Sequence, residues 1–158
     1  MSDLVRIGLI SDTHGVLPDG VAAAFSGVTR ILHAGDVGSR AILDGLMHIA
    51  PVTAVRGNVD EAYDLTRLPS FSVTDVAGVR IALTHIRDRA ITVGDARRRG
   101  CDAYVFGHTH VPVVSEEDGL WLVNPGSASR ARSGNGRSVA VLEAEDGEVR
   151  SVRIVPLA

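Results

Sequence analysis

The sequence predicts an α/β (α+β) fold in which two β-sheets pack face to face and helices cover the outside. Two observations lead to this prediction. Residues 4–56 alternate apolar strand-like runs with helical segments, which is typical of parallel strands with right-handed crossovers. From residue 70 onward, short strands follow one another, and Ala-Gly or Asp-Gly turns join several of them into hairpins. The length of 158 residues suits one core but not two ordinary domains, so we expect a single domain over residues 1–158.

The first half of the chain predicts three parallel strands and two helices. The strands are expected at residues 4–10, 30–33 and 52–56, because these runs are apolar and rich in β-branched residues. One helix is expected from Pro18 to Phe25, since proline suits the first turn of a helix, and Gly27 ends it. A second helix is expected from the N-cap Ser39 to about His48.

The second half predicts mostly strands. These are expected at residues 70–76, 79–83, 103–106, 111–116, 120–123, 138–143 and 149–155. Turns at residues 77–78, 118–119 and 146–147 favour antiparallel pairing of the strands that they join. One helix is expected from Ile91 to Arg99, with Gly100 as its stop.

Composition excludes several classes of function. The net charge is −3, which argues against a nucleic-acid surface held by charge alone. All 16 basic residues are arginine, so lysine chemistry such as a Schiff base or a P-loop is absent. The single Cys101 excludes an intrachain disulfide and a cysteine-rich metal site. No apolar run reaches the ~18 residues of a membrane span, and the first residues do not read as a signal peptide, so we expect a cytoplasmic protein without a membrane partner.

The candidate functional residues all follow the end of a predicted strand. They are Asp12, His14, Asp36, Asn58, His85, His108 and His110. Polar side chains at the carboxyl edge of a sheet can converge in one cleft. Imidazole, carboxylate and amide groups without a thiolate favour Mn²⁺, Fe²⁺, Co²⁺, Ni²⁺ or Zn²⁺. Seven ligands are too many for one four-coordinate zinc, whereas they suit two ions that share a carboxylate.

Such a pair of ions has a defined chemistry. Two ions ~3.5–4 Å apart clamp a phosphoryl group and lower the pKa of a shared water. The resulting hydroxide attacks phosphorus in line, while the ions and any nearby arginine take up charge on the other oxygens.

The order of these motifs resembles the calcineurin-like metallophosphoesterase superfamily. The motifs are Asp12-x-His14, Gly35-Asp36, Gly57-Asn58, His85 and Gly107-His108-Thr109-His110. Together with Asn124-Pro125-Gly126-Ser127 and the short length, they resemble the small bacterial and archaeal phosphodiesterases of the YfcE/MJ0936 type. The resemblance covers nearly the whole chain and implies a β-sandwich flanked by helices, with the site at one sheet edge.

Carried over position by position, the resemblance implies two metal sites. The first would be held by Asp12, His14 and His110, the second by Asn58, His85 and His108, and Asp36 would bridge the ions. Within this set, it implies Asp36, Asn58 and His108 as catalytic residues. It also implies two divalent ions, with Mn²⁺ first and Ni²⁺, Zn²⁺, Fe²⁺ or Co²⁺ as alternatives, a small-molecule phosphodiester as substrate, and a homodimer or homotetramer.

Two departures from the family pattern bear on function. Val59 stands where larger phosphoesterases have a histidine that protonates the leaving group, which favours diesters or good leaving groups. Ile86 follows His85 where the family usually has glycine, so a bulky side chain narrows or alters that side of the cleft. The alternative functions are a non-catalytic binding scaffold of the Vps29 type, which shares the fold, and a phosphomonoesterase with an acid from elsewhere.

Several further polar residues have competing interpretations. His33 is expected to be a core histidine or a partner that orients a ligand, rather than a ligand. Arg130 and Arg132 belong either to a solvated loop or to a clamp on the substrate phosphate. Asp60 is expected to be a loop residue, or a proton donor if its pKa is strongly raised. Residues 97–99, all arginine, are expected to be an exposed helix end.

Overall fold

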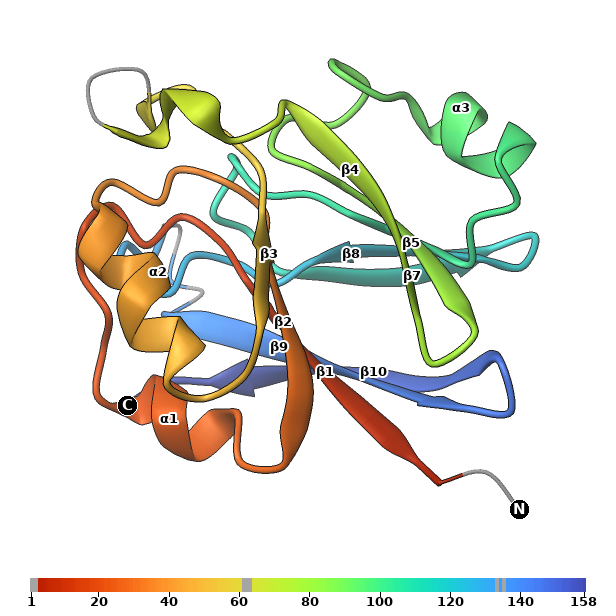
Figure 1. Ribbon diagram of the computed structural model, residues 1–158, viewed down its shortest axis with the longest axis horizontal. Coiled ribbons are helices and arrows are strands. Elements are labelled where there is room, and N and C mark those ends of the chain that lie inside the picture. The colour runs from red at the N-terminus through yellow and green to blue at the C-terminus, as the bar shows by residue number, and fades with distance from the viewer. Residues whose placement is uncertain (1–2, 61–63, 133, 135) are drawn as a thin grey trace.

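Two five-stranded sheets lie face to face in the computed structural model, which describes residues 3–60, 64–132, 134 and 136–158 (Figure 1). The first sheet contains, in spatial order, β10 (Glu148–Pro156), β9 (Ser138–Glu145), β1 (Val5–Ile10), β2 (Val28–His33) and β3 (Val52–Ala54). The second contains β4 (Phe71–Val76), β5 (Val79–Thr84), β6 (Ala103–Val105), β8 (Leu120–Asn124) and β7 (Val113–Glu117). The predicted two-sheet architecture is therefore confirmed.

Each sheet contains three parallel neighbours. These are β1, β2 and β3 in the first sheet and β5, β6 and β8 in the second. The pairs β9–β10, β4–β5 and β7–β8 are antiparallel, as the hairpin turns predict, and β1 and β9 are antiparallel as well. The carboxyl ends of β1, β2 and β3 therefore lie along one edge of the first sheet, and those of β5 and β6 along one edge of the second.

Helices α1 (Gly20–Ala24), α2 (Arg40–Met47) and α3 (Val93–Arg98) lie outside the sheets, and a short 3₁₀ helix, η2 (Asp64–Arg67), follows β3 (Figure 1). Ser39 caps α2 as predicted, since its hydroxyl accepts from the Ala41 N–H. Helix α3 begins two residues later than predicted, because Thr92 and Asp95 form a capping box. Strand β3 ends earlier than predicted, because the Arg56 N–H donates to the Pro69 carbonyl instead of continuing the ladder. The sequence did not predict η2.

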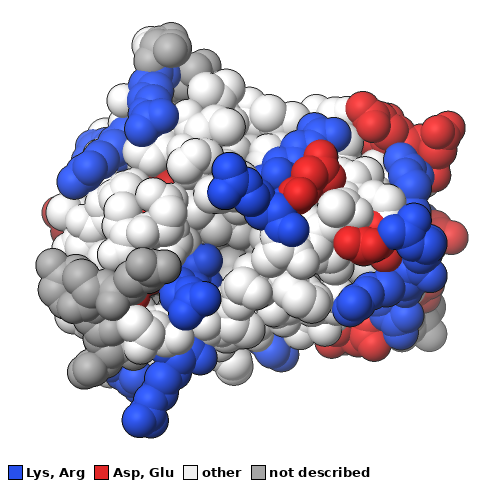
Figure 2. All heavy atoms as spheres, turned by 90° about the horizontal axis from the view of Figure 1, so that it is seen from above, with Lys and Arg blue, Asp and Glu red and all other residues white. Residues whose placement is uncertain are grey.

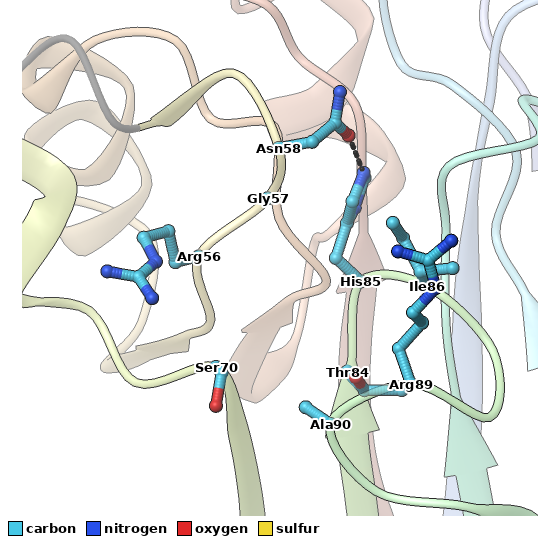
Figure 3. Close-up of a pocket in the computed structure, with 9 residues that line it drawn as sticks. All are labelled: Arg56, Gly57, Asn58, Ser70, Thr84, His85, Ile86, Arg89 and Ala90. Carbon is cyan, nitrogen blue, oxygen red and sulfur yellow. Dashed lines mark hydrogen bonds between the residues drawn. The ribbon is translucent and has the colours of Figure 1, made fainter.

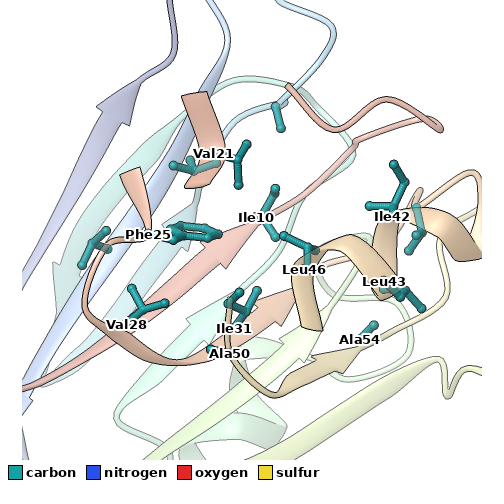
Figure 4. Close-up of a cluster of buried hydrophobic side chains, with 14 of the residues drawn as sticks. Ile10, Val21, Phe25, Val28, Ile31, Ile42, Leu43, Leu46, Ala50 and Ala54 are labelled. Atoms are coloured by element: carbon teal, nitrogen blue, oxygen red, sulfur yellow. The ribbon is translucent and has the colours of Figure 1, made fainter. Parts of the chain in front are cut away.

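Aliphatic side chains form the cores. One core lies between the sheets and includes Leu9, Leu32 and Leu83, all fully buried. A second lies between the first sheet and α1 and α2, where Phe25 and Leu46 pack over Ile31 (Figure 4). A third cluster of buried side chains includes Tyr104 and Phe106. Together these cores fix the relative positions of the strand ends that carry the candidate ligands. Within the described residues, no helix is long and apolar enough to cross a membrane.

Candidate metal centre

The seven predicted ligands come from loops that follow five strands. Asp12 and His14 follow β1, Asp36 follows β2 and Asn58 follows β3, all in the first sheet. His85 follows β5, and His108 and His110 follow β6, in the second sheet. Each sheet thus contributes part of the cluster, and the site spans the edge that the two sheets share.

Six of these side chains form two groups with the composition of metal sites. One group is Asp12, His14 and His110, and the other is Asp36, His85 and His108; in each, three ligand atoms lie within 4.8 Å of one another. Asn58 joins the second group, since its Oδ1 is 2.9 Å from His85 Nε2. The structure therefore brings all seven predicted residues together, in the grouping that the sequence motifs imply.

Asp36 lies between the two groups. Its Oδ2 is 3.2 Å from His85 Nε2 and 3.7 Å from His14 Nε2, so one carboxylate faces both. Its other oxygen accepts the Val59 N–H at 3.0 Å, which fixes the carboxylate in orientation. This geometry fits the bridging position expected of Asp36.

A buried atom without a partner supports the fit of a cation. Asp12 is fully buried, and its Oδ1 has no hydrogen-bond partner among the described residues. The same oxygen is 3.2 Å from His110 Nε2 and 3.7 Å from His14 Nε2. A buried carboxylate oxygen is costly to leave unpaired, whereas an ion between it and the two imidazoles would satisfy all three atoms.

The hydrogen bonds of His85 point to the same conclusion. Its Nδ1 donates to the Ala34 carbonyl at 2.8 Å, which orients the ring and leaves Nε2 toward the cluster. In the neutral ring, Nε2 carries a lone pair and faces Asp36 Oδ2 at 3.2 Å. A lone pair and a carboxylate oxygen at this distance repel each other unless a proton or a metal ion lies between them.

The pKa shifts reflect this field of negative charge. Burial lowers the pKa of His85, but the hydrogen bond that its ring donates to Asp36 and the charge of Asp12 outweigh burial and raise it. For Asp36, burial raises the pKa, yet His85 and the Val59 N–H together hold it below its usual range. For His14, burial prevails and the pKa is lowered. The two buried carboxylates therefore favour a positive charge at the centre of the cluster.

Five of the seven candidate ligands have left-handed backbone. The φ angles are 55° at Asp12, 47° at His14, 54° at Asp36, 72° at His108 and 64° at His110. This conformation is uncommon for residues other than glycine and is concentrated at functional sites. It ends each strand abruptly and turns the side chains into the space between the sheets.

The glycines before two ligands are required by close packing. A Cβ at Gly57 would lie 2.2 Å from Asp36 Oδ1, and one at Gly107 would lie 2.6 Å from Asp12 Oδ2. Any larger residue would displace a carboxylate of the centre. The Gly-Asn and Gly-His pairs of the sequence motifs therefore have a steric cause.

Asp60 fixes the loops that carry Asp36 and Asn58. Its side chain is fully buried and accepts N–H groups from Gly57 at 2.8 Å, Gly38 at 3.0 Å and Val37 at 3.2 Å. All these contacts hold it as an acceptor, so the geometry gives it a positioning role and not that of a proton donor. The sequence did not identify this role.

His33 joins two ligand loops, as an orienting partner would. The Gly35 N–H donates to its Nδ1 at 3.1 Å, which leaves the Nε2 proton to bond Thr13 Oγ1 at 3.0 Å. The Thr13 hydroxyl in turn donates to the Val37 carbonyl at 2.8 Å. Complete burial lowers the pKa of His33 to about 4, so the ring is neutral.

The Asn-Pro-Gly-Ser turn after β8 supports the centre from the other side. Asn124 Nδ2 donates to the Gly107 carbonyl at 3.1 Å, and Ser127 Oγ donates to the Asp12 carbonyl at 2.8 Å. These bonds hold the loops of the first metal group in place. The motif was visible in the sequence, but only the structure gives its contacts.

Arginines surround the centre. Arg130 is exposed, and its positive charge contributes to the lowered pKa of His14. Arg132 is exposed on the same loop. On the opposite side, Arg56 and Arg89 line a cavity of about 210 Å³ next to Asn58 and His85 (Figure 3). The sequence analysis did not single out Arg56 or Arg89, since neither belongs to a motif.

Residues 97–99, all arginine, lie exposed at the end of α3, as expected. Arg97 donates to the carbonyls of Glu117 and Asp118. Arg98 pairs with Asp95, and Arg99 lies over the Phe71 ring.

Comparisons with known proteins agree with this geometry. Residues 5–147 match the family described as the calcineurin-like phosphoesterase superfamily domain. The chain is 36% identical over 161 residues to a probable metallophosphoesterase of Methanothermobacter thermautotrophicus, with 94% of this chain and 91% of that protein covered. It is 32% identical over 173 residues to the phosphodiesterase YfcE of Escherichia coli, with the same shares covered.

One solved structure of this fold is Vps29 of Entamoeba histolytica in complex with Zn²⁺. It has a TM-score of 0.76 at 22% identity, and 96% of this chain and 97% of that chain are covered. At this identity, the likeness shows the fold alone.

Proposed function

The chain belongs to the calcineurin-like phosphoesterase superfamily and is a metal-dependent phosphoesterase, and from this premise we propose that it hydrolyses phosphate diesters at a centre of two divalent ions. The observation that carries the proposal is the pair of ligand groups that share the Asp36 carboxylate. We propose Asp12, His14 and His110 as ligands of one ion, and Asn58, His85 and His108 as ligands of the other. Asp36 would bridge them, and Asp36, Asn58 and His108 would lie next to the reacting phosphate.

The residues of this chain supply orientation and charge. Two bound ions would provide a water of lowered pKa and would offset charge on the phosphate oxygens. Asp60, His33 and Ser127 hold the ligand loops in position before substrate arrives, so little reorganisation is required. Arg130 is proposed to bind a phosphate oxygen from the His14 side, and Arg132 is proposed as a second, more peripheral contact.

The absence of a side chain that could protonate the leaving group supports the preference for diesters. Val59 follows Asn58 and is 38% exposed, and its side chain has no proton to donate. Asp60, the next residue, is buried with its oxygens bonded to backbone N–H groups. A site without a proton donor favours substrates whose leaving group departs without protonation. Relatives named as phosphodiesterases support the same preference.

Mn²⁺ is the proposed ion, with Zn²⁺, Ni²⁺, Fe²⁺ or Co²⁺ as alternatives that suit the same ligands. We further propose one domain over residues 1–158, a homodimer or homotetramer, and a cytoplasmic location, each from the sequence and the family.

A scaffold of the Vps29 type is the second candidate, because proteins of that name share the fold. Since one of them is described with Zn²⁺, metal content alone does not separate the two functions.

A measurement of turnover separates the phosphodiesterase from the non-catalytic scaffold. We expect the purified protein to hydrolyse bis-p-nitrophenyl phosphate with Mn²⁺ and to lose this activity in a chelator. We also expect a higher kcat/KM for this diester than for p-nitrophenyl phosphate. Equal rates with and without metal would refute the metal-dependent mechanism, and a preference for the monoester would refute the diester assignment. Absence of turnover together with one stoichiometric protein partner would favour the scaffold.

A further inference from the structure

A cavity beside the metal centre is not required to hold the ions. It has a volume of about 210 Å³ and shares Asn58 and His85 with the second ligand group (Figure 3). Ligand sites for a whole small molecule usually measure about 300–1,000 Å³. The cavity therefore suits one part of a substrate whose scissile phosphate lies on the neighbouring centre.

The cavity has a positive wall. Its nine lining residues include two arginines and no acidic residue. Figure 3 shows the Arg56 side chain directed away from Asn58 and His85, whereas Arg89 extends from its loop toward Ile86. Arg56 donates to the Thr66 carbonyl at 3.1 Å, whereas the Arg89 guanidinium has no hydrogen bond or ion pair with any residue that the structure describes. The face of the molecule seen from above presents arginines around its middle, with an acidic side chain beside them, and at one end acidic side chains mixed with further arginines (Figure 2).

The loop that presents Arg89 is anchored. The Tyr104 hydroxyl accepts the Asp88 N–H at 2.9 Å and donates to the Ile91 carbonyl at 2.7 Å. Asp88 Oδ1 accepts the Val93 N–H at 2.9 Å, which ties the same loop to α3. The other oxygen of Asp88, Oδ2, lies 3.5 Å from Arg87 Nε, so this carboxylate is paired with Arg87 and not with Arg89. A fixed backbone with a free guanidinium lowers the entropy lost on binding an anion.

We infer that this cavity is a subsite for a second anionic group, a phosphate or a carboxylate, on the alcohol portion of the diester substrate. Arg89 donates to that anion, and Ile86 and Ala90 contact the carbon chain that joins the two groups. The inference rests on the proposed diester hydrolysis, because the ester on the metal centre places the second anion. It also gives the bulky Ile86 a function, since its side chain forms one wall of the cavity.

Two pairs of probes test the subsite. Thymidine 5′-(p-nitrophenyl phosphate) is compared with its 3′-phosphorylated form, and ethyl p-nitrophenyl phosphate with carboxymethyl p-nitrophenyl phosphate. Within each pair the leaving group is the same and only the second anion differs. We expect kcat/KM to be about tenfold higher for the member that carries the second anion, as for a charge-assisted hydrogen bond in a partly exposed site. The pair with the larger ratio identifies phosphate or carboxylate as the preferred anion.

Arg89→Gln should abolish this ratio and leave kcat/KM for the members without a second anion within about twofold. Arg89→Lys should restore part of the ratio. Arg87→Gln is the matched control, because Arg87 lies on the same loop, over the Phe106 ring and paired with Asp88, and does not line the cavity. An equal loss on all four probes in Arg89→Gln would show that Arg89 binds the scissile phosphate instead, and no change on any probe would also overturn the subsite.

Failure of the proposed function has a different signature. In that case wild-type protein would not hydrolyse bis-p-nitrophenyl phosphate with Mn²⁺ at all. Calorimetric titration with thymidine 3′,5′-bisphosphate and with thymidine 5′-monophosphate would still test the subsite. About tenfold tighter binding of the bisphosphate, lost in Arg89→Gln and kept in Arg87→Gln, supports it, and equal affinities refute it.

Discussion

Replacing Asp36 with asparagine removes one charge from both metal groups at once. The side chain keeps its shape, and its Oδ1 can still accept the Val59 N–H at 3.0 Å, so the fold should persist. The carboxylate oxygen faces His85 Nε2 at 3.2 Å and His14 Nε2 at 3.7 Å, which places it within reach of an ion in either group. Opposite unit charges ~4 Å apart attract by about 4 kcal/mol at an effective dielectric constant of about 20.

Because the ions are divalent, this value is a lower bound, and a loss of about 4 kcal/mol corresponds to roughly three powers of ten in each metal dissociation constant. We therefore expect Asp36→Asn to bind both ions at least about a thousandfold more weakly and to lose at least as much in kcat/KM at limiting Mn²⁺. Calorimetric titration with Mn²⁺ and elemental analysis measure the first effect, and bis-p-nitrophenyl phosphate measures the second. Asp19→Asn is the control, because Asp19 is exposed and its side chain makes no capping bond to α1. If Asp36→Asn keeps two ions per chain at wild-type affinity, the bridging role is wrong.

Three further substitutions test how the centre is built. Asp60→Asn should lower the free energy of unfolding by about 2–3 kcal/mol, because an amide cannot accept the three N–H groups that the carboxylate accepts. Urea unfolding measures this loss, and a loss below about 0.5 kcal/mol would contradict the positioning role of Asp60. His33 has a pKa of about 4 when folded and about 6.5 when unfolded, so the unfolded state binds more protons between these values. The unfolding free energy of chelator-treated protein should therefore fall by up to about 3 kcal/mol from pH 7 to pH 4, and His33→Gln should reduce this dependence, whereas identical pH profiles would refute the assignment. Val59→His should raise kcat/KM for phenyl phosphate at least about tenfold by supplying a proton donor, and an unchanged rate would show that the missing acid does not set the preference.

The clustering of the seven candidate ligands could be predicted from the sequence because each of them follows a recognisable strand. Alternation of strands and helices in residues 4–56 places Asp12, Asp36 and Asn58 at one sheet edge without further information. His85 and His110 belong to the second sheet, and nothing local in the sequence says that its edge meets the first. The order of the motifs supplied that step, and the packing between the sheets explains it.

The positioning residues could not be predicted in the same way. Asp60 has the sequence context of any loop carboxylate, and its role depends on three N–H groups from two loops that are 19 or more residues apart. Ser127 acts on the Asp12 carbonyl across 115 residues. Arg89 lies in a loop with no periodicity, and its importance comes from a cavity that only the folded chain forms. Such contacts depend on the packed loops, which local propensity does not specify.

The left-handed backbone at five ligands connects the site to the stability of the whole molecule. Each such residue costs about 1 kcal/mol or more relative to an ordinary conformation, so the five together cost at least about 5 kcal/mol, comparable to the net stability of a small domain. Glycine would relieve the strain at any of them but would remove a ligand. The strain is therefore retained at the positions where a side chain must turn sharply off a strand into the cleft. The extensive cores on both faces of the first sheet offset this cost, and bound ions would offset more of it.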